Sequence, residues 1–123
     1  MNHLEIAREL SRNKEIFKQL LQNIEPAQFI WRPQPEKWCL LEIICHLNDE
    51  EREDFRARTK HILDTPNEPM PKIDPQAWVK DRSYMNNDYK EMLNKFLAER
   101  DESIEYVKSL TDANWENVYV HPR

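Results

Sequence analysis

The 123-residue chain contains no glycine, and this absence limits what it can fold into. Tight hairpin turns and phosphate-binding loops depend on glycine, because it adopts left-handed backbone conformations at little steric cost. Gly-rich nucleotide loops and two-residue glycine hairpins are therefore excluded. Long helices joined by proline-containing connections need glycine least, and the chain has eight prolines. The sequence predicts an all-α fold.

Composition and charge narrow the class of protein. Apolar residues make up 39% and charged residues 33%, which is typical of one globular domain with a charged exterior. The net charge of −5 argues against a general nucleic-acid binder, which needs a basic face. No run of eighteen apolar residues and no signal-peptide pattern occurs, so we expect no membrane partner.

The two cysteines indicate the compartment. Cys39 and Cys45 are six residues apart, and on one helix they would point about 120° from each other, too far for a disulfide bond. Two free thiols indicate a reducing environment, and we expect a cytoplasmic protein.

Three long segments, residues 3–24, 40–63 and 88–110, have the apolar spacing of amphipathic helices. In the first and third, Glu5 and Glu91 stand where a capping box places an acidic residue. The predicted core-facing stripes are Ile6, Leu10, Phe17, Leu20, Leu21 and Ile24; then Leu40, Ile44, Leu47, Phe55 and Ile62; then Tyr89, Met92, Leu93, Phe96, Leu97, Ile104 and Val107.

The connections between these helices predict their relative directions. Residues 26–37 hold three prolines and two aromatic side chains, which favours an ordered turn over one end of a bundle. More than twenty residues separate the second and third helices, and four of these residues are prolines. The second helix would be about 36 Å long, and a proline-rich segment advances about 3 Å per residue. The long connection can therefore cross back, leaving the second and third helices parallel.

Of four histidines, only His46 has neighbours that suggest chemistry. It lies within EIICHLNDEE, on the edge of the apolar face of the second helix. Glu50 follows one turn later, within reach of the imidazole or of a shared cation, and Glu42 and Asp49 lie on neighbouring lines of the helix. The structural alternative is a half-buried histidine paired with Glu42 or Glu50.

Zinc or nickel at His46 would need two or three more ligands from elsewhere. His61 is fifteen residues further along the same predicted helix, about 22 Å away, so it cannot share a metal with His46 within one chain. His3 and His121 lie near the termini and could approach only if the fold brings them there.

The remaining residues that could carry chemistry are better explained by structural roles. Cys39 occupies the apparent N-cap of the second helix near Lys37, which could activate its thiol, but it also suits the place of a capping serine or threonine. Cys45 is expected to be a packing residue rather than a reactive one, and so are the tryptophans, Trp31, Trp38, Trp78 and Trp115. The acidic runs DEERED and ERDE are interpreted as solvated helix faces. No Glu-x-x-His motif recurs, which argues against a di-metal bundle.

The run WRPQPEKWCLLEIICHLNDEE, residues 31–51, resembles the DinB/YfiT-like superfamily of metal-binding four-helix bundles. The matching elements are the Trp-x-Pro turn, Lys37-Trp38 before the capping position, Glu42, and then His46-Leu47 followed by Asp49. Cys39 departs from the serine or threonine usual at the capping position. The first helix, the long crossover and the terminal Asn114-Trp115 to His121-Pro122 stretch resemble the family layout more loosely.

The resemblance implies a divalent metal, zinc or nickel, held by three histidines. His46 matches the first, and the two that the family carries on a fourth helix have no counterpart before Arg123. We therefore expect one domain, residues 1–123, that stops before the fourth helix of an up-down bundle. The open seam that such a domain would leave favours a homodimer in which each subunit covers the other's gap.

Two functions follow as expectations from the resemblance. In the first, the family's metal activates a low-molecular-weight thiol or water for transfer or hydrolysis, with His46 as ligand and Glu50 or Asp49 supporting it. The substrate is left open, and the 123-residue chain alone is expected to be inactive. In the second, the chain is a non-catalytic helical module that acts through dimerisation or partner binding.

Overall fold

The computed structural model describes residues 2–120, and this part of the chain contains helices and connections but no strand. The all-α prediction is therefore confirmed. The elements are α1 (His3–Leu21), α2 (Pro26–Phe29), α3 (Leu40–Glu50), the π-helical η1 (Glu51–Arg56), α4 (Ala57–Asp64), α5 (Pro75–Asp81), the 3₁₀-helical η2 (Tyr84–Asn86) and α6 (Tyr89–Lys108). No helix among these residues is long and apolar enough to cross a membrane.

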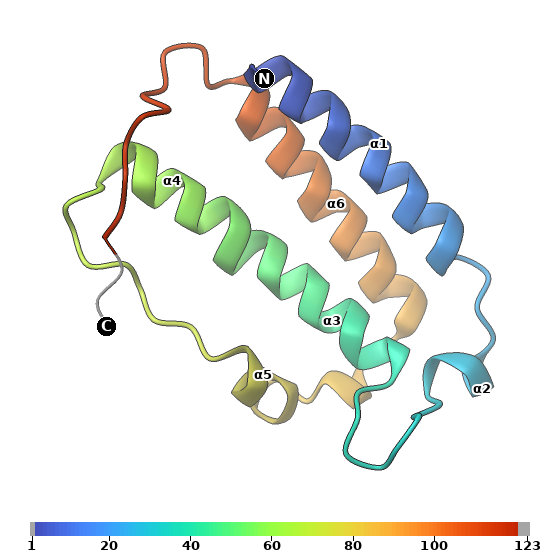
Figure 1. Ribbon diagram of the computed structural model, residues 1–123. Helices are drawn as coiled ribbons and strands as arrows, with labels where there is room; N and C mark the ends of the chain where they lie inside the picture. The colour runs from blue at the N-terminus through green and yellow to red at the C-terminus, as the bar shows by residue number, and fades with distance from the viewer. Residues whose placement is uncertain (1, 121–123) are drawn as a thin grey trace.

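Three long helical rods lie side by side, with α6 between α1 and the continuous rod α3–η1–α4 (Figure 1). The chain runs in the same direction along the α3–α4 rod and α6, and in the opposite direction along α1. The predicted crossover is therefore confirmed, and it carries two short helices, α5 and η2, that the sequence analysis did not anticipate. Contacts agree with the parallel pairing, since Glu51 bonds Arg100 and Arg56 bonds Ser103 further along both rods.

Side-chain caps set the helix starts. The Asn2 side chain accepts a hydrogen bond from the backbone N–H of Glu5 at 2.9 Å, and Asp88 accepts one from Glu91 at the same distance. Each cap satisfies one of the backbone donors that a helix start leaves unpaired. Helix α1 ends at Leu21 rather than near Ile24, because Asn23 takes a left-handed conformation with φ of 60°.

The second rod differs from the uninterrupted α-helix that the sequence predicts. Residues 51–56 form a π-helical segment, after which the α-helix resumes at Ala57. Such segments disturb the regular 3.6-residue spacing on which an apolar stripe is predicted. Phe55, predicted as a core residue, is 56% exposed in this segment.

The core sits at the α3–α6 contact and the crossover turns that close it. Its buried members are Cys39, Leu41, Ile44, Cys45, Trp78, Tyr84, Tyr89, Met92 and Leu93. Helix α1 is only half covered: of its residues only Ala7 is buried, and Leu20, also predicted for the core, is 67% exposed. Trp31 and Trp115, which were expected to be packing residues, are also largely exposed. Large apolar side chains on α1 and on the second rod, such as Leu20 and Phe55, are therefore exposed.

The acidic run after His46 is not the solvated face that we expected. Asp49, Glu50 and Glu51 are all buried. Glu51 accepts two hydrogen bonds from the guanidinium of Arg100, at 2.9 and 3.0 Å. Buried charges are tolerated when they are paired in this way, so this run ties the second rod to α6.

Candidate functional site

His46 lies in the middle of α3 with 24% of its side chain exposed. Its imidazole packs against the indole of Trp38, with ring centroids 5.0 Å apart. Trp38 directly precedes the N-cap of α3, so the start of the helix also positions the ring that covers His46. This contact was not predicted from the sequence, in which Trp38 was assigned only to packing.

A network of hydrogen bonds holds that helix start. Cys39 and Glu42 form a reciprocal capping box, in which the Glu42 carboxylate accepts the Cys39 N–H at 3.0 Å. The Arg32 guanidinium donates to the same carboxylate and to the Lys37 carbonyl. Burial would raise the pKa of Glu42, but the hydrogen bonds from Arg32 and Cys39 outweigh it and leave the pKa below its ordinary value. Glu42 is thus a capping residue rather than the predicted partner of His46.

Neither cysteine has the surroundings of a reactive thiol. Cys39 is 1% exposed, and its sulfur lies 3.4 Å from the sulfur of Met85. It serves as the cap of α3, the structural alternative that we considered. Cys45 is fully buried, and burial raises the pKa of its thiol to about 12. Both cysteines are free, as predicted.

His46 and Glu50 face each other one helical turn apart. The His46 Nε2 atom lies 3.7 Å from Oε1 of Glu50, which is too long for a hydrogen bond. The other ring nitrogen, Nδ1, is enclosed and has no hydrogen-bond partner among residues 2–120. Burial lowers the pKa of His46, although Asp49 and Asp54 act in the opposite direction. The imidazole is therefore held in the neutral form that metals bind.

Glu50 lies in an acidic environment. Burial, the hydrogen bond with Asp54 and the charge of Asp54 raise the pKa of Glu50 to about 7. Arg58 lies 2.7 Å from Asp54 and offsets part of this negative charge. Glu50, Asp54 and Arg58 follow one another at four-residue spacing, which was visible in the sequence. A second positive charge beside Glu50 would relieve the crowding of the two carboxyl groups.

The spacing of His46 and Glu50 fits two donors to one ion. Zinc binds imidazole nitrogen and carboxylate oxygen at about 2.0–2.2 Å, so two such donors on one ion lie at most about 4 Å apart. The observed 3.7 Å is within this limit. The pair can therefore supply two ligands to a divalent metal without a change in the helix backbone.

Asp49, which we expected to support a metal at His46, is engaged elsewhere. Asp49 accepts a hydrogen bond from the Tyr84 hydroxyl at 2.6 Å and pairs with Arg82 at 3.1 Å. It therefore belongs to the contact between α3 and the crossover. His61 lies on α4 with its Nε2 atom 2.8 Å from the Glu68 carbonyl. His3 begins α1, and His121 lies outside the described residues.

No group of three or more histidine, cysteine, aspartate or glutamate side chains in the described part of the chain could hold a metal ion. The three-histidine set that the resemblance implies is therefore not assembled within residues 2–120. What these residues offer at His46 is one imidazole and one carboxylate.

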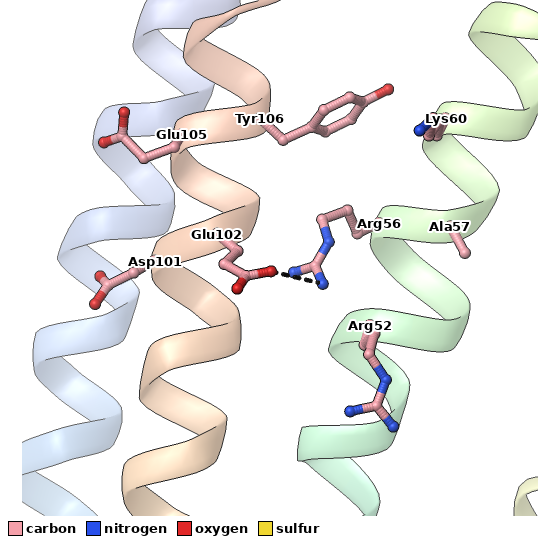
Figure 2. A pocket seen from close by; sticks show the side chains of 8 residues that line it. All are labelled: Arg52, Arg56, Ala57, Lys60, Asp101, Glu102, Glu105 and Tyr106. Carbon is pink, nitrogen blue, oxygen red and sulfur yellow. Dashed lines mark ion pairs between the residues drawn. The ribbon is translucent and has the colours of Figure 1, made fainter.

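A separate cleft of about 640 Å³ lies between the η1–α4 part of the second rod and α6, and His46 is not among its lining residues. Figure 2 shows Arg56 of η1 reaching toward Glu102 of α6, whereas Asp101 and Glu105 point away from the basic side chains. Arg56 crosses this cleft to Glu102 at 3.3 Å and also bonds Glu99 at 2.6 Å. Because its charges pair across the gap, the cleft does not present the basic face that nucleic acid would require.

The fold and the site define a class of protein. It is a helical bundle with a long crossover, in which a half-buried histidine and a carboxyl group share one helix face. The family model of the DinB superfamily matches residues 9–123, and the chain belongs to this superfamily. The recognition drawn from residues 31–51 is thereby confirmed. Neither the comparison with curated proteins nor that with solved structures gave a match.

Proposed function

We propose that this protein is a divalent-metal-dependent enzyme of the DinB type, a thiol-dependent transferase or a hydrolase, with His46 as a ligand of zinc or nickel. The observation that carries the proposal is the 3.7 Å separation between His46 Nε2 and Glu50 Oε1. It suits two donors to one ion better than it suits a hydrogen bond. Membership of the DinB superfamily supports metal dependence as the general chemistry.

The residues around the pair have complementary roles in this proposal. Trp38 packs on one side of the imidazole and restricts its rotation. The neutral form of His46 leaves Nε2 free to bind, and a cation beside Glu50 would favour the ionised carboxylate over the protonated form that burial and Asp54 favour. When bound, the metal would supply the chemistry by lowering the pKa of a coordinated thiol or water.

Metal content per chain tests the ligand role. The protein is loaded with zinc and with nickel, desalted and measured by plasma mass spectrometry, beside His46→Ala, Glu50→Gln and the control His61→Ala. We expect His46→Ala to lose the metal, Glu50→Gln to bind it more weakly and His61→Ala to match the wild type. Equal metal retention by His46→Ala and the wild type would rule out the ligand role.

Activity separates the two reaction types. The metal-loaded protein is incubated with an electrophilic model substrate, with and without a low-molecular-weight thiol. Consumption of the thiol identifies a transferase, and product formation in water alone identifies a hydrolase. Rates in His46→Ala equal to those of the metal-loaded wild type would argue against both.

The alternative function is a helical module that acts through association, as a homodimer or with another protein. The exposed side chains of Phe55 and Trp115, which line one cavity together with Ile6 and Leu10, support it, because contiguous apolar surface marks interaction sites. In this alternative, association is independent of metal and is unaffected by His46→Ala. Light scattering at micromolar concentration, in the presence of a chelator, measures it directly. A monomer under these conditions would exclude a homodimer of this type.

Both functions suit a reducing compartment, and we propose the cytoplasm. The two free, buried cysteines support this assignment.

A further inference from the structure

We propose that a cavity between α3, the crossover and α6 binds a small neutral cyclic amide, such as a lactam or a pyrimidine base, through the side chain of Asn48. The cavity has a volume of about 490 Å³, and His46 is not among its lining residues. His46 and Asn48 are two residues apart on α3, so their side chains leave the helix about 200° from each other. The cavity is therefore separate from the proposed metal site, and its ligand does not depend on a metal.

Asn48 carries a buried amide group without a partner. The residue is 5% exposed, and its Oδ1 atom is enclosed with no hydrogen-bond partner among residues 2–120. No hydrogen bond joins its Nδ2 atom to another described residue either. Most buried side-chain polar atoms in proteins have a partner, because an unpaired one lowers stability. A ligand that forms hydrogen bonds with this amide would remove that unfavourable contribution.

The shape of the amide group indicates the class of ligand. A side-chain amide has a C=O acceptor and N–H donors side by side in one plane. A cyclic amide has the same two groups on adjacent atoms, so it can form both hydrogen bonds at once, as asparagine does with the edge of a base. Because the protein holds neither end of the Asn48 amide, the group can turn about its Cβ–Cγ bond and present both ends to the cavity.

The charges that line the cavity favour a neutral ligand. Each charged side chain in the lining has an opposite charge within 3.8 Å, and these side chains are Asp49, Arg52, Arg82, Lys95 and Glu99. An ionic ligand would have to break one of these pairs, whereas a neutral ligand leaves them intact. Met92, which is 7% exposed, adds an apolar surface to the same lining. A small molecule with apolar faces and a polar amide edge matches this combination.

The crossover side of the cavity is held in place by its own contacts. Tyr84 is 2% exposed, and its hydroxyl donates to Asp49 at 2.6 Å. Arg82 pairs with the same carboxylate at 3.1 Å, and its guanidinium lies 4.3 Å from the centre of the Trp78 ring. A preformed wall reduces the entropy that is lost on binding. The cavity also has the size of known small-molecule sites, which is about 300–1,000 Å³.

A titration with uracil, followed by nuclear magnetic resonance of the isotope-labelled protein, tests the inference. Uracil is a small neutral cyclic amide. Dimethyluracil is the matched control ligand, because methyl groups replace both of its N–H donors. We expect uracil to shift the backbone amide signals of Asn48 and Tyr84, and dimethyluracil to bind at least tenfold more weakly. Inorganic phosphate should leave these signals unchanged.

Two variants and one control locate the site. Asn48→Ala should raise the Kd for uracil at least tenfold. Because the Asn48 amide has no partner to lose, the melting temperature of this variant without ligand should be unchanged or higher. Ala98→Phe places a large side chain at an exposed position of the lining and should weaken binding by a similar factor. Asn94→Ala changes an exposed asparagine of α6 outside the cavity, and it should bind as the wild type does.

Several results would overturn the inference. Unchanged signals at saturating uracil would exclude this class of ligand. Equal affinities for uracil and dimethyluracil, or for the wild type and Asn48→Ala, would exclude recognition through the amide. Binding of phosphate in place of uracil would show that the paired charges open for an anion. A lower melting temperature of Asn48→Ala without ligand would show that Asn48 stabilises the fold instead of waiting for a ligand.

Discussion

The carboxylate of Glu51 and the guanidinium of Arg100 form a two-pronged contact that links the π-helical segment to the middle of α6. Their side chains are only 4% and 9% exposed. Removing one member of a buried ion pair leaves the other charge uncompensated, which typically costs about 3–5 kcal/mol. We therefore expect Arg100→Ala to lower the free energy of unfolding, measured by urea denaturation, by an amount in this range.

The exposed pair of Lys14 and Asp101 is the matched control. It joins α1 to α6, as the buried pair joins η1 to α6, and its atoms are 2.7 Å apart. Exposed pairs contribute about 1 kcal/mol or less, so Lys14→Ala should change the unfolding midpoint little. Equal effects of Arg100→Ala and Lys14→Ala would contradict the structural importance of the buried pair.

Ser83 adopts a left-handed conformation, with φ of 49°, at the turn before η2. This conformation is about 1–2 kcal/mol unfavourable for a residue with a Cβ atom, whereas for glycine it is nearly neutral. The Ser83 side chain caps no helix, so removing it should cause little loss of stability. Ser83→Gly should stabilise the protein by up to about 1 kcal/mol after the greater flexibility of the unfolded chain is included.

Ser109 is the comparison for this substitution, because it ends α6 with an ordinary negative φ of −76°. Thermal melts of Ser83→Gly and Ser109→Gly should therefore shift in opposite directions. A lower melting temperature for Ser83→Gly would show that the left-handed strain is compensated elsewhere.

The raised pKa of Glu50 predicts how metal-free protein responds to pH. Between the ordinary value of 4.5 and about 7, folded Glu50 retains a proton that the unfolded chain has lost. The stabilising effect of this proton is complete at low pH and disappears as pH rises through 7. In the presence of a chelator, the free energy of unfolding of the wild type should fall between pH 5 and pH 8. Glu50→Gln cannot lose this proton, so its free energy of unfolding should fall less over the same range.

Glu53 has the opposite behaviour and serves as the contrast. The hydrogen bond from Arg82 lowers the pKa of Glu53, which burial opposes. Its contribution is present above the ordinary pKa of glutamate and is lost as pH falls through the lower folded value. Glu53→Gln should therefore lower the unfolding midpoint at pH 8, and this effect should shrink as pH falls through the lowered pKa of Glu53. Parallel pH profiles for the two variants would contradict these assignments.

The cysteines should be unreactive while the protein is folded. Cys39 is 1% exposed and Cys45 is inaccessible to solvent, with the pKa of its thiol raised to about 12 by burial. Thiolate is the reactive form, so a disulfide reagent at pH 8 should label neither cysteine until the chain unfolds. Labelling rates that follow urea concentration in step with unfolding would support this result. In Cys39→Ala only Cys45 remains, and in Cys45→Ala only Cys39 remains. Rapid labelling of either folded variant would contradict the prediction and identify the accessible thiol.

Much of the fold was predictable from local signals. Asn2 and Asp88 marked helix starts by their capping side chains, and the number of residues in the proline-rich connection was sufficient for the crossover. The stripes of α3 and α6 were read correctly where regular α-helix persists, as at Ile44 and Phe96. The predicted apolar stripe was wrong at Phe55, because the π-helical segment changes the residue spacing there. No sequence signal indicated that segment.

At the candidate site, spacing along one helix was informative and contacts between elements were not. The proximity of Glu50 to His46 followed from four-residue spacing. That Asp49 turns to Tyr84 and Arg82 could not be predicted, since both partners come from the crossover. The burial of Glu51 depends likewise on Arg100, 49 residues away. Charged runs are usually solvated, and only the tertiary partner changes that expectation.

The position of α6 between the other two rods has a consequence for how the chain folds during synthesis. Helix α1 leaves the ribosome before α6, but the residues that hold it in place come 68 and 87 positions later: Tyr89 bonds the Leu21 carbonyl, and Asp101 pairs with Lys14. Contacts between residues so distant in sequence form slowly, because the loop between them must close first. Until α6 has emerged, the apolar side of α1 has no place to bind within the chain. During that interval the side of α1 that packs on α6 is exposed to solvent and to other proteins.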